Sequence, residues 1–142
     1  MAHTCVWQVS KNDAVTLADY GRFKLVCCKE IEAAEKLLRS SRELDRNCVV
    51  ALFNLGVLLY NCKEDRKGAE ECFRAAVKAD PDHSETYRYL GRIMADKSDL
   101  VNSGKFYAMA MERAKDGEAA AAIKKEMEAS GVAAGSSRRL SK

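Results

Sequence analysis

A single proline occurs among the 142 residues, and only 7% of the residues are aromatic. β-Branched residues are also few, whereas alanine, glutamate, lysine and leucine, which favour helices, are abundant. Because residues that break helices or favour strands are scarce, the composition predicts an all-α protein. The length is typical of one domain.

Long apolar runs are missing as well. No run approaches the roughly 18 residues that a membrane-spanning helix needs. The first residues, MAHTCVWQVSKND, lack the basic start and apolar core of a secretory signal. We therefore expect no membrane insertion and an intracellular, cytoplasmic location.

Neither sign of charge dominates the sequence. There are 24 basic and 21 acidic residues, which leaves a formal net charge of +3. Nucleic-acid-binding proteins usually carry a concentrated basic face. We therefore expect no nucleic-acid partner.

Residue sets for metal or covalent chemistry are also lacking. The six cysteines include no C-x-x-C pair, and the two histidines, His3 and His83, do not have the spacing of zinc ligands. The sequence contains no recognisable nucleophile with a base and no glycine-rich phosphate loop. We expect no enzyme activity, no metal and no cofactor. The adjacent thiols Cys27 and Cys28 are ordinary thiols or, alternatively, a redox or soft-metal pair.

Three glycines recur at a fixed interval inside segments of helical pattern. Gly21, Gly56 and Gly91 are each 35 residues apart, and glycine inside a helix costs roughly 1 kcal/mol relative to alanine. Leu17, Leu52 and Tyr87 follow the same step. The third unit has one residue fewer in its turn, so Ala34, Ala69 and Ser103, and likewise Leu38, Phe73 and Tyr107, are separated by 35 and then 34 residues. A period of this length indicates a repeat protein. We expect each glycine to lie where two helices cross closely.

Each of the three units is predicted to form two helices. Apolar residues recur at helical spacing, Pro81 ends the second unit, and Ser84 is the expected N-cap of the third. The expected helices are 13–28 and 30–44, then 49–61 and one that opens in the polar run 63–67, then 84–96 and 100–115.

The repeated motif resembles the tetratricopeptide repeat, whose signature is W-x-x-L-G-x-x-Y…A-x-x-x-F…P. The second unit reads Leu52-x-x-Leu55-Gly56-x-x-Leu59, Ala69-x-x-x-Phe73 and Pro81, and the third reads Tyr87-x-x-Leu90-Gly91-x-x-Met94 and Ser103-x-x-x-Tyr107. The first unit is more degenerate, and the turns of the first two units are one residue longer than is usual in the family. The resemblance implies a short right-handed α-solenoid of three repeats, about 14–48, 49–83 and 84–117.

The two ends of the chain differ from the repeats. Residues 118–130 are predicted to form a capping helix with Ile123 and Met127 on its apolar face, closed by Gly131. The tail 131–142 is basic and is expected to be disordered. Its Arg138-Arg139-Leu140-Ser141 motif makes Ser141 a candidate phosphorylation site. The arm 1–12 contains Trp7, which packs on the first unit or meets a partner.

A concave groove is implied by the family resemblance, in which the first helices of successive repeats hold a peptide or a partner's helix. The corresponding positions are Asp19 and Arg22 in the first unit, Asn54, Val57 and Asn61 in the second, and Arg88, Tyr89 and Arg92 in the third. Arg88 and Arg92 are four residues apart and share one helix face. Guanidinium groups bind carboxylates in a bidentate manner. We therefore expect an acidic peptide or a carboxyl terminus as the partner.

Some tetratricopeptide proteins clamp the C-terminal carboxylate of heat-shock chaperones with a set of five Lys, Asn and Arg residues. Only Asn54 matches that set in this sequence. The other positions hold Ala18, Arg22, Glu85 and Tyr89, and the Glu85 carboxylate would repel another carboxylate. We therefore do not expect binding of chaperone tails.

Two kinds of non-enzymatic role fit these features. The protein is an adaptor or scaffold whose groove binds a segment of a partner protein. Alternatively, it is a structural subunit of a larger assembly, held through its convex face, its ends or the Trp7 arm. Self-association stays open in both cases, because an exposed repeat end can pair with a copy of itself.

Overall fold

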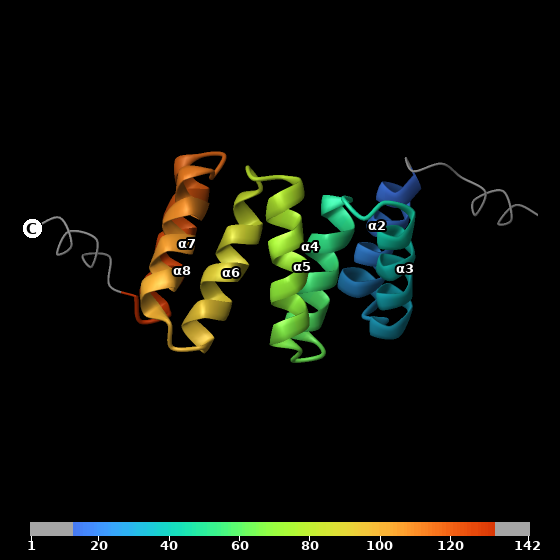
Figure 1. Cartoon of the computed structure of the whole chain (residues 1–142), viewed down its shortest axis with the longest axis horizontal. Helices are drawn as coiled ribbons and strands as arrows, with labels where there is room; N and C mark the ends of the chain where they lie inside the picture. The colour runs from blue at the N-terminus through green and yellow to red at the C-terminus, as the bar shows by residue number, and fades with distance from the viewer. Residues whose placement is uncertain (1–12, 133–142) are drawn as a thin grey trace, which may run out of the picture. The chain divides into compact units, whose positions relative to one another are not determined.

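The computed structural model describes residues 13–132, and all regular secondary structure in this range is helical (Figure 1). The chain divides into two compact units that are larger than the single repeats: the first unit, Met1–Ala79, holds the helices of the first two repeats, and the second unit, Asp80–Lys142, holds those of the third repeat. The described part of the first unit contains α2 (Asp13–Phe23), the π-helix η1 (Lys24–Cys28), α3 (Ile31–Leu44), α4 (Val49–Asn61) and α5 (Arg66–Ala79). The described part of the second contains α6 (Ser84–Asp96), α7 (Leu100–Glu112) and α8 (Gly117–Ala129). The all-α prediction is confirmed.

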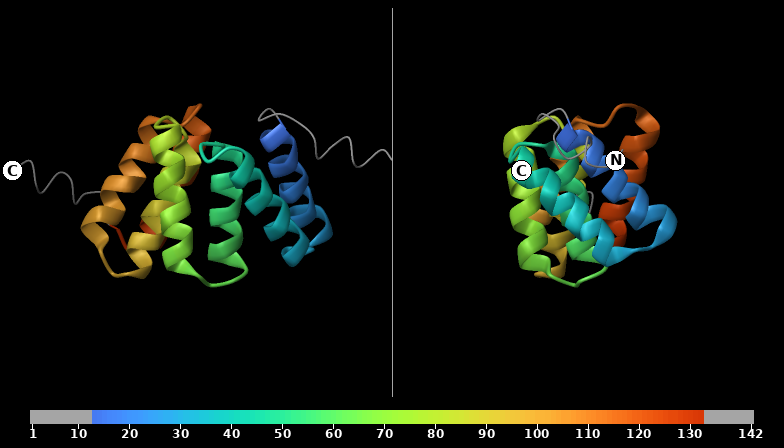
Figure 2. Two further views of the ribbon diagram at one scale, coloured as in Figure 1. Left: turned by 45° about the vertical axis from the view of Figure 1, so that its right-hand side comes forward. Right: turned by 90° about the vertical axis from the view of Figure 1, so that its right-hand side faces the viewer.

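The helices form antiparallel pairs, α2 with α3, α4 with α5, and α6 with α7 (Figures 1 and 2). The bounds of α4 agree with the prediction, but α7 ends at Glu112, three residues before the expected Lys115. Arg113 Nη1 donates to the Met109 carbonyl oxygen at 3.2 Å, which satisfies one of the last carbonyl groups of α7. Asp116 is already the extended N-cap of α8, so the chain has to leave the helix before that residue.

The recurring glycines allow the two helices of each pair to approach closely, as predicted. A Cβ atom on Gly56 would lie 2.7 Å from Phe73 Cε1, and one on Gly91 would lie 2.9 Å from Tyr107 Cδ2. The corresponding distance from Gly21 to Leu38 Cγ is 2.9 Å. The three facing side chains, Leu38, Phe73 and Tyr107, are fully buried. Each glycine therefore makes room for the large side chain at the matching position of the second helix.

The first helix of the first repeat changes type along its length. The expected helix 13–28 is helical to its predicted end, but Lys24–Cys28 is π-helical. A π-turn spans more residues than an α-turn, so it accommodates the additional residue expected at this connection. Lys29 follows in the left-handed region with φ 56°, and its N–H donates to the Lys24 carbonyl oxygen.

Ser84 was expected to be the N-cap of the third repeat, and that prediction is wrong. His83 occupies the cap position with an extended backbone, and Ser84 is the first residue of α6. The Ser84 hydroxyl instead donates to the Ala110 carbonyl oxygen of α7 at 2.8 Å. The serine therefore joins the two helices of the pair.

The capping helix α8 closes the core of the second unit. Ile123 and Met127 are buried, at 1% and 6% exposure, as their spacing predicted. Gly131 ends the helix with φ 87°, a conformation that glycine adopts readily. Val132 is also buried, at 3% exposure, so the packed part of the chain reaches two residues beyond the expected end of the cap.

Several predictions fall on residues outside the described range. The arm 1–12 with Trp7, and the tail residues 133–142 with Ser141, belong to this group. The division of the chain into arm, repeat domain 13–130 and tail stays a prediction. None of the helices within 13–132 has the length and apolar character required to cross a membrane.

Candidate functional site

Two arginines of α6 converge on one carboxylate of α8. Arg92 Nη2 lies 2.6 Å from Glu126 Oε1, and Arg92 Nε donates to the same oxygen at 2.8 Å. Arg88 Nε lies 3.5 Å from Glu126 Oε2. The side chains of Arg88, Tyr89, Arg92 and Glu126 are named here the Arg88–Arg92 cluster.

The cluster is partly shielded from water. Tyr89 is buried, and the guanidinium of Arg92 lies 4.6 Å from the centre of its ring, within the range of cation–π attraction. Burial lowers the pKa of Arg92, but the hydrogen bond and charge of Glu126 outweigh this effect and raise that pKa overall. Glu126 also accepts from the Tyr107 hydroxyl at 3.3 Å. The guanidinium of Arg92 is therefore held in place between Glu126 and the ring of Tyr89.

One hydrogen-bond donor of the cluster is left over. Arg88 Nη2 pairs with Glu85 at 2.9 Å, whereas Arg88 Nε is buried without a hydrogen bond among the described residues. Its 3.5 Å separation from Glu126 is an ion pair without hydrogen-bond geometry. A buried donor of this kind costs free energy until an acceptor reaches it.

Glu126 was not predicted from the sequence. The segment 118–130 was interpreted by its apolar face, and Glu126 directly precedes the buried Met127. Its spacing of three from Ile123 places it beside that face of the helix. This spacing is a signal for proximity to the core, but the facing arginines come from another helix.

The predicted site residues of the first unit lie in more ordinary surroundings. Asn54 is buried, and its Nδ2 donates to the Val50 carbonyl oxygen of the same helix at 2.8 Å. Val57 is half-buried and Asn61 is exposed. Arg22 is exposed and pairs with Asp19 at 3.6 Å. Arg22, Asn54, Val57 and Asn61 belong to the first unit, and a shared groove with the Arg88–Arg92 cluster stays a prediction.

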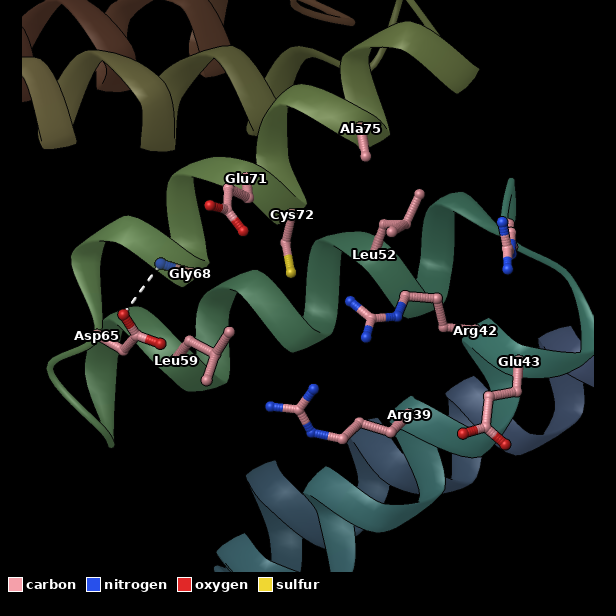
Figure 3. Close-up of a pocket in the computed structure, with 11 residues that line it drawn as sticks. Arg39, Arg42, Glu43, Leu52, Leu59, Asp65, Gly68, Glu71, Cys72 and Ala75 are labelled. Carbon is pink, nitrogen blue, oxygen red and sulfur yellow. Dashed lines mark hydrogen bonds between the residues drawn. The ribbon is translucent and has the colours of Figure 1, made fainter.

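A cleft of about 600 Å³ lies among α3, α4 and α5 of the first unit (Figure 3). Arg39 and Arg42 of α3, together with Arg46 just beyond this helix, line one wall. Leu52 and Leu59 of α4 provide apolar lining. We name this feature the arginine cleft.

The arginine cleft also carries acidic groups and a thiol. Glu43 of α3, Asp65 just before α5 and Glu71 of α5 also line the cleft, so its three arginines face an equal number of carboxylates. Asp65 Oδ1 accepts from the Gly68 N–H at 3.0 Å. Cys72 is buried at 4% exposure, and burial raises the pKa of its thiol, although the nearby charges of Arg42 and Arg39 oppose this rise. Arg39 Nε donates to Glu35 Oε2 at 2.9 Å.

The arginine cleft was also not predicted from the sequence. Arg39 and Arg42 are three residues apart, the spacing of one face of α3, and Arg46 follows in the turn after this helix. That spacing is the signal in the sequence that points to an arginine wall. No group of three or more potential metal-binding residues is present within 13–132.

Comparison with known proteins identifies the fold. No protein-family model and no curated protein matches the chain. The translocator chaperone SycD of Yersinia enterocolitica is similar, with a TM-score of 0.75 and 15% identity over 87% of both chains. PcrH of Pseudomonas aeruginosa, in complex with the chaperone-binding region of PopD, has a TM-score of 0.74 and 16% identity over 87% of this chain and 94% of that one.

A tetratricopeptide repeat domain is among the similar structures. The first such domain of Spaghetti (RPAP3), bound to the HSP90 peptide SRMEEVD, has a TM-score of 0.70 and 19% identity, over 85% of this chain and 95% of that one. These similarities show that the chain has a tetratricopeptide-like fold of helical repeats.

Proposed function

We propose that this protein is a tetratricopeptide repeat protein that acts as a non-enzymatic adaptor or scaffold inside the cell. Its partner is a protein segment with acidic side chains, which binds at the Arg88–Arg92 cluster. The fold supports a binding role, because PcrH and the Spaghetti domain with similar folds are each solved with a peptide or protein segment bound.

The observation that carries the proposal is the convergence of Arg88 and Arg92 on a single carboxylate. Glu126 has the chemical group that an acidic partner would offer, so the arrangement is suited to carboxylates. A partner's carboxylate that displaces Glu126 would meet two guanidinium groups and the unused Arg88 Nε donor. Charge-assisted bonds of this type are among the strongest hydrogen bonds in proteins.

A peptide selection tests this proposal. A displayed library of random peptides is selected on the wild-type protein, and the best binder is synthesised with a fluorescent label. Its affinity is then measured by fluorescence anisotropy for the wild type and for Arg88→Gln/Arg92→Gln. Hydrogen bonds to charged groups contribute about 1.5–3 kcal/mol each, so the double variant should bind at least about tenfold more weakly.

The matched control is Arg66→Gln/Arg74→Gln, which removes the same charge from α5 of the first unit. Both of these residues are exposed, and circular dichroism checks that all variants keep the helicity of the wild type. Selected peptides without acidic enrichment, or an affinity equal in both double variants, would refute the proposal.

The alternative role as a structural subunit has one observation in its favour. Tyr20, Phe23 and Val26, on α2 and η1, are 50%, 52% and 66% exposed. Large apolar side chains at the end of a repeat array are typical of contacts with another protein. This role predicts that partner binding survives the loss of Arg88 and Arg92.

A further inference from the structure

We propose that the N-terminal arm, residues 1–12, folds back on the first unit and packs Trp7 on an apolar surface of α2 and α3. The arm covers the first repeat, as α8 covers the third. This inference goes beyond the proposed binding role and does not depend on the Arg88–Arg92 cluster.

α2 presents aromatic side chains to solvent. Tyr20 and Phe23 are 50% and 52% exposed, and their spacing of three makes them neighbours on the helix. Phe23 lies nine residues, or two and a half turns, after the fully buried Ala14, so it points to the opposite side of α2. Large apolar side chains that are exposed together in this way indicate a contact surface.

α3 contributes two leucines to the same side of the helix pair. A Cβ atom on Gly21 would lie 2.9 Å from Leu38 Cγ, so these two residues face each other. In antiparallel right-handed helices, the residues that directly precede two facing residues lie on one side of the pair, which makes Tyr20 and Leu37 neighbours. Leu44 comes seven residues, or two turns, after Leu37 and is 37% exposed.

This side of the pair faces away from α4 and α5. Leu37 precedes Arg39 by two positions and Leu44 follows Arg42 by two, which places each leucine roughly 200° around the helix from an arginine. Because Arg39 and Arg42 line the arginine cleft beside α4 and α5, the two leucines point away from those helices. We name the outer apolar surface by its four residues, Tyr20, Phe23, Leu37 and Leu44.

The arm is long enough to reach the outer apolar surface. Trp7 precedes Asp13, the first residue of α2, by six residues, and an extended chain of that length spans about 20 Å. Phe23 lies ten residues beyond Asp13, about 15 Å along the helix. Ser10 and Asn12 belong to the residue types that favour turns, so the sequence suits a reversal of the chain just before α2.

The arm also has side chains that match this surface. Val6, Trp7 and Val9 occur within four residues. The Lys24 ammonium lies 5.5 Å from the centre of the Tyr20 ring, which leaves Phe23 as the more open aromatic side chain for Trp7. Aromatic pairs contribute more than the area that they bury.

The arm has an advantage over a second copy of the chain or another protein. It is joined to α2, so its effective concentration at the surface is on the order of millimolar. The chain already covers its third repeat with its own residues, since Ile123 and Met127 of α8 are 1% and 6% exposed. Repeat proteins require such covers at their terminal repeats.

Intrinsic fluorescence of the full chain tests the inference, because Trp7 is the sole tryptophan. In the folded wild type we expect a blue-shifted emission and acrylamide quenching that is severalfold weaker than in urea. Phe23→Ser/Leu44→Ser changes two exposed side chains and should shift the emission to the red and increase the quenching severalfold. The matched control is Leu100→Ser/Val101→Ser on α7, where the two side chains are 45% and 66% exposed, and it should leave the signal unchanged.

Circular dichroism checks that both double variants keep the wild-type helicity. Wild-type quenching equal to that in urea, or a signal unchanged in Phe23→Ser/Leu44→Ser, would overturn the inference. A blue-shifted emission that is lost on dilution, together with the mass of a dimer in light scattering, would show that a second copy covers the surface and would also overturn it.

Trp7→Ser tests whether the arm acts as a cover. Without its anchor the outer apolar surface is open, so binding of a hydrophobic dye should rise severalfold above the wild-type level. The rise should disappear when Phe23→Ser and Leu44→Ser are added to Trp7→Ser. Equal dye binding by the wild type and Trp7→Ser would refute the cover and leave this surface to a partner protein.

Discussion

Arg92 of α6 and Glu126 of α8 form an ion pair, with Arg92 Nη2 2.6 Å from Glu126 Oε1 and both side chains less than one-third exposed. The carboxylate of the capping helix thus occupies the arginine pair that we propose for a partner's acidic group. A partner must displace Glu126. The partner's apparent affinity is its intrinsic affinity multiplied by the fraction of molecules in which Glu126 has left the arginines. The capping helix would therefore link the stability of the second unit to access to the proposed binding site.

We predict that Glu126→Gln binds the selected acidic peptide more tightly than the wild type. The neutral amide no longer competes for Arg88 and Arg92, and the net positive charge of the cluster increases. The same change should lower the free energy of unfolding by about 1–2 kcal/mol, because a half-buried charge-assisted hydrogen bond is lost. Anisotropy titrations and urea unfolding measure the two effects.

Glu128→Gln is the matched control for this prediction. Glu128 is exposed on the same helix, so its loss changes the net charge equally without touching the arginines. Affinity that rises by the same factor in both variants would show a general charge effect. An unchanged affinity in Glu126→Gln would mean that the arginines do not bind the peptide's carboxylates.

Replacement of Gly56 should destabilise the fold. A Cβ atom would lie 2.7 Å from Phe73 Cε1, and Phe73 is fully buried. Overpacking costs about 1–3 kcal/mol, which exceeds the roughly 1 kcal/mol that alanine gains over glycine in helix propensity. Thermal melts should rank the wild type above Gly56→Ala, and Gly56→Ala above Gly56→Val.

Gly117→Ala provides the comparison, since a Cβ at this first residue of α8 has no neighbour within 4 Å. We expect it to melt at or above the wild-type temperature. Equal melting temperatures for Gly56→Val and the wild type would contradict the packing role assigned to the repeated glycine.

The repeated glycines also show how much of the fold was predictable. Gly56 and Phe73 each recur at the repeat interval, so the sequence identifies both positions. Their contact follows because they belong to the two adjacent helices of one repeat. The π-helix η1 was not predictable, because it depends on where the backbone accommodates the extra residue of the turn. Ser84 was misassigned because a serine before a helix caps it only if no better partner is near, and Ala110 offers one.

The candidate sites were less predictable than the helices. Arg88 and Arg92 share a helix face by spacing alone, so their proximity followed from the sequence. Their partner Glu126 lies 34 residues after Arg92, and only the packing of α8 brings it there. The arginine cleft depends on three helices at once, and its acidic wall on α5 has no fixed spacing from Arg39 or Arg42.

Stability should fall as the pH decreases through the titration range of His83. Burial lowers the pKa of His83 below the ordinary value of 6.5, although Asp80 and Glu85 oppose this and Lys115 adds to it. The unfolded chain therefore takes up a proton at a higher pH than the folded chain does. The stabilising contribution is complete above about pH 6.5 and is lost as the pH falls toward the folded pKa.

Urea unfolding between pH 7.5 and 5.5 measures this effect where most carboxylates do not titrate. His83→Asn should flatten the pH dependence, since asparagine is a good N-cap and carries no titratable group. His3→Asn removes the other histidine and serves as the comparison variant. A wild-type stability that is constant across this range would disprove the prediction.

The N-cap of α8 provides the last prediction. Asp116 Oδ1 accepts from the Ala119 N–H at 2.8 Å, and the loss of such a cap costs about 0.5–2 kcal/mol. Asp116→Ala should therefore lower the free energy of unfolding by this amount, whereas Asp116→Asn should retain most of it. If the capping helix restricts access to the arginines, Asp116→Ala should also bind the acidic peptide more tightly than Asp116→Asn. Lower stability without tighter binding would mean that Glu126 remains on Arg88 and Arg92 even when the first turn of α8 is loosened.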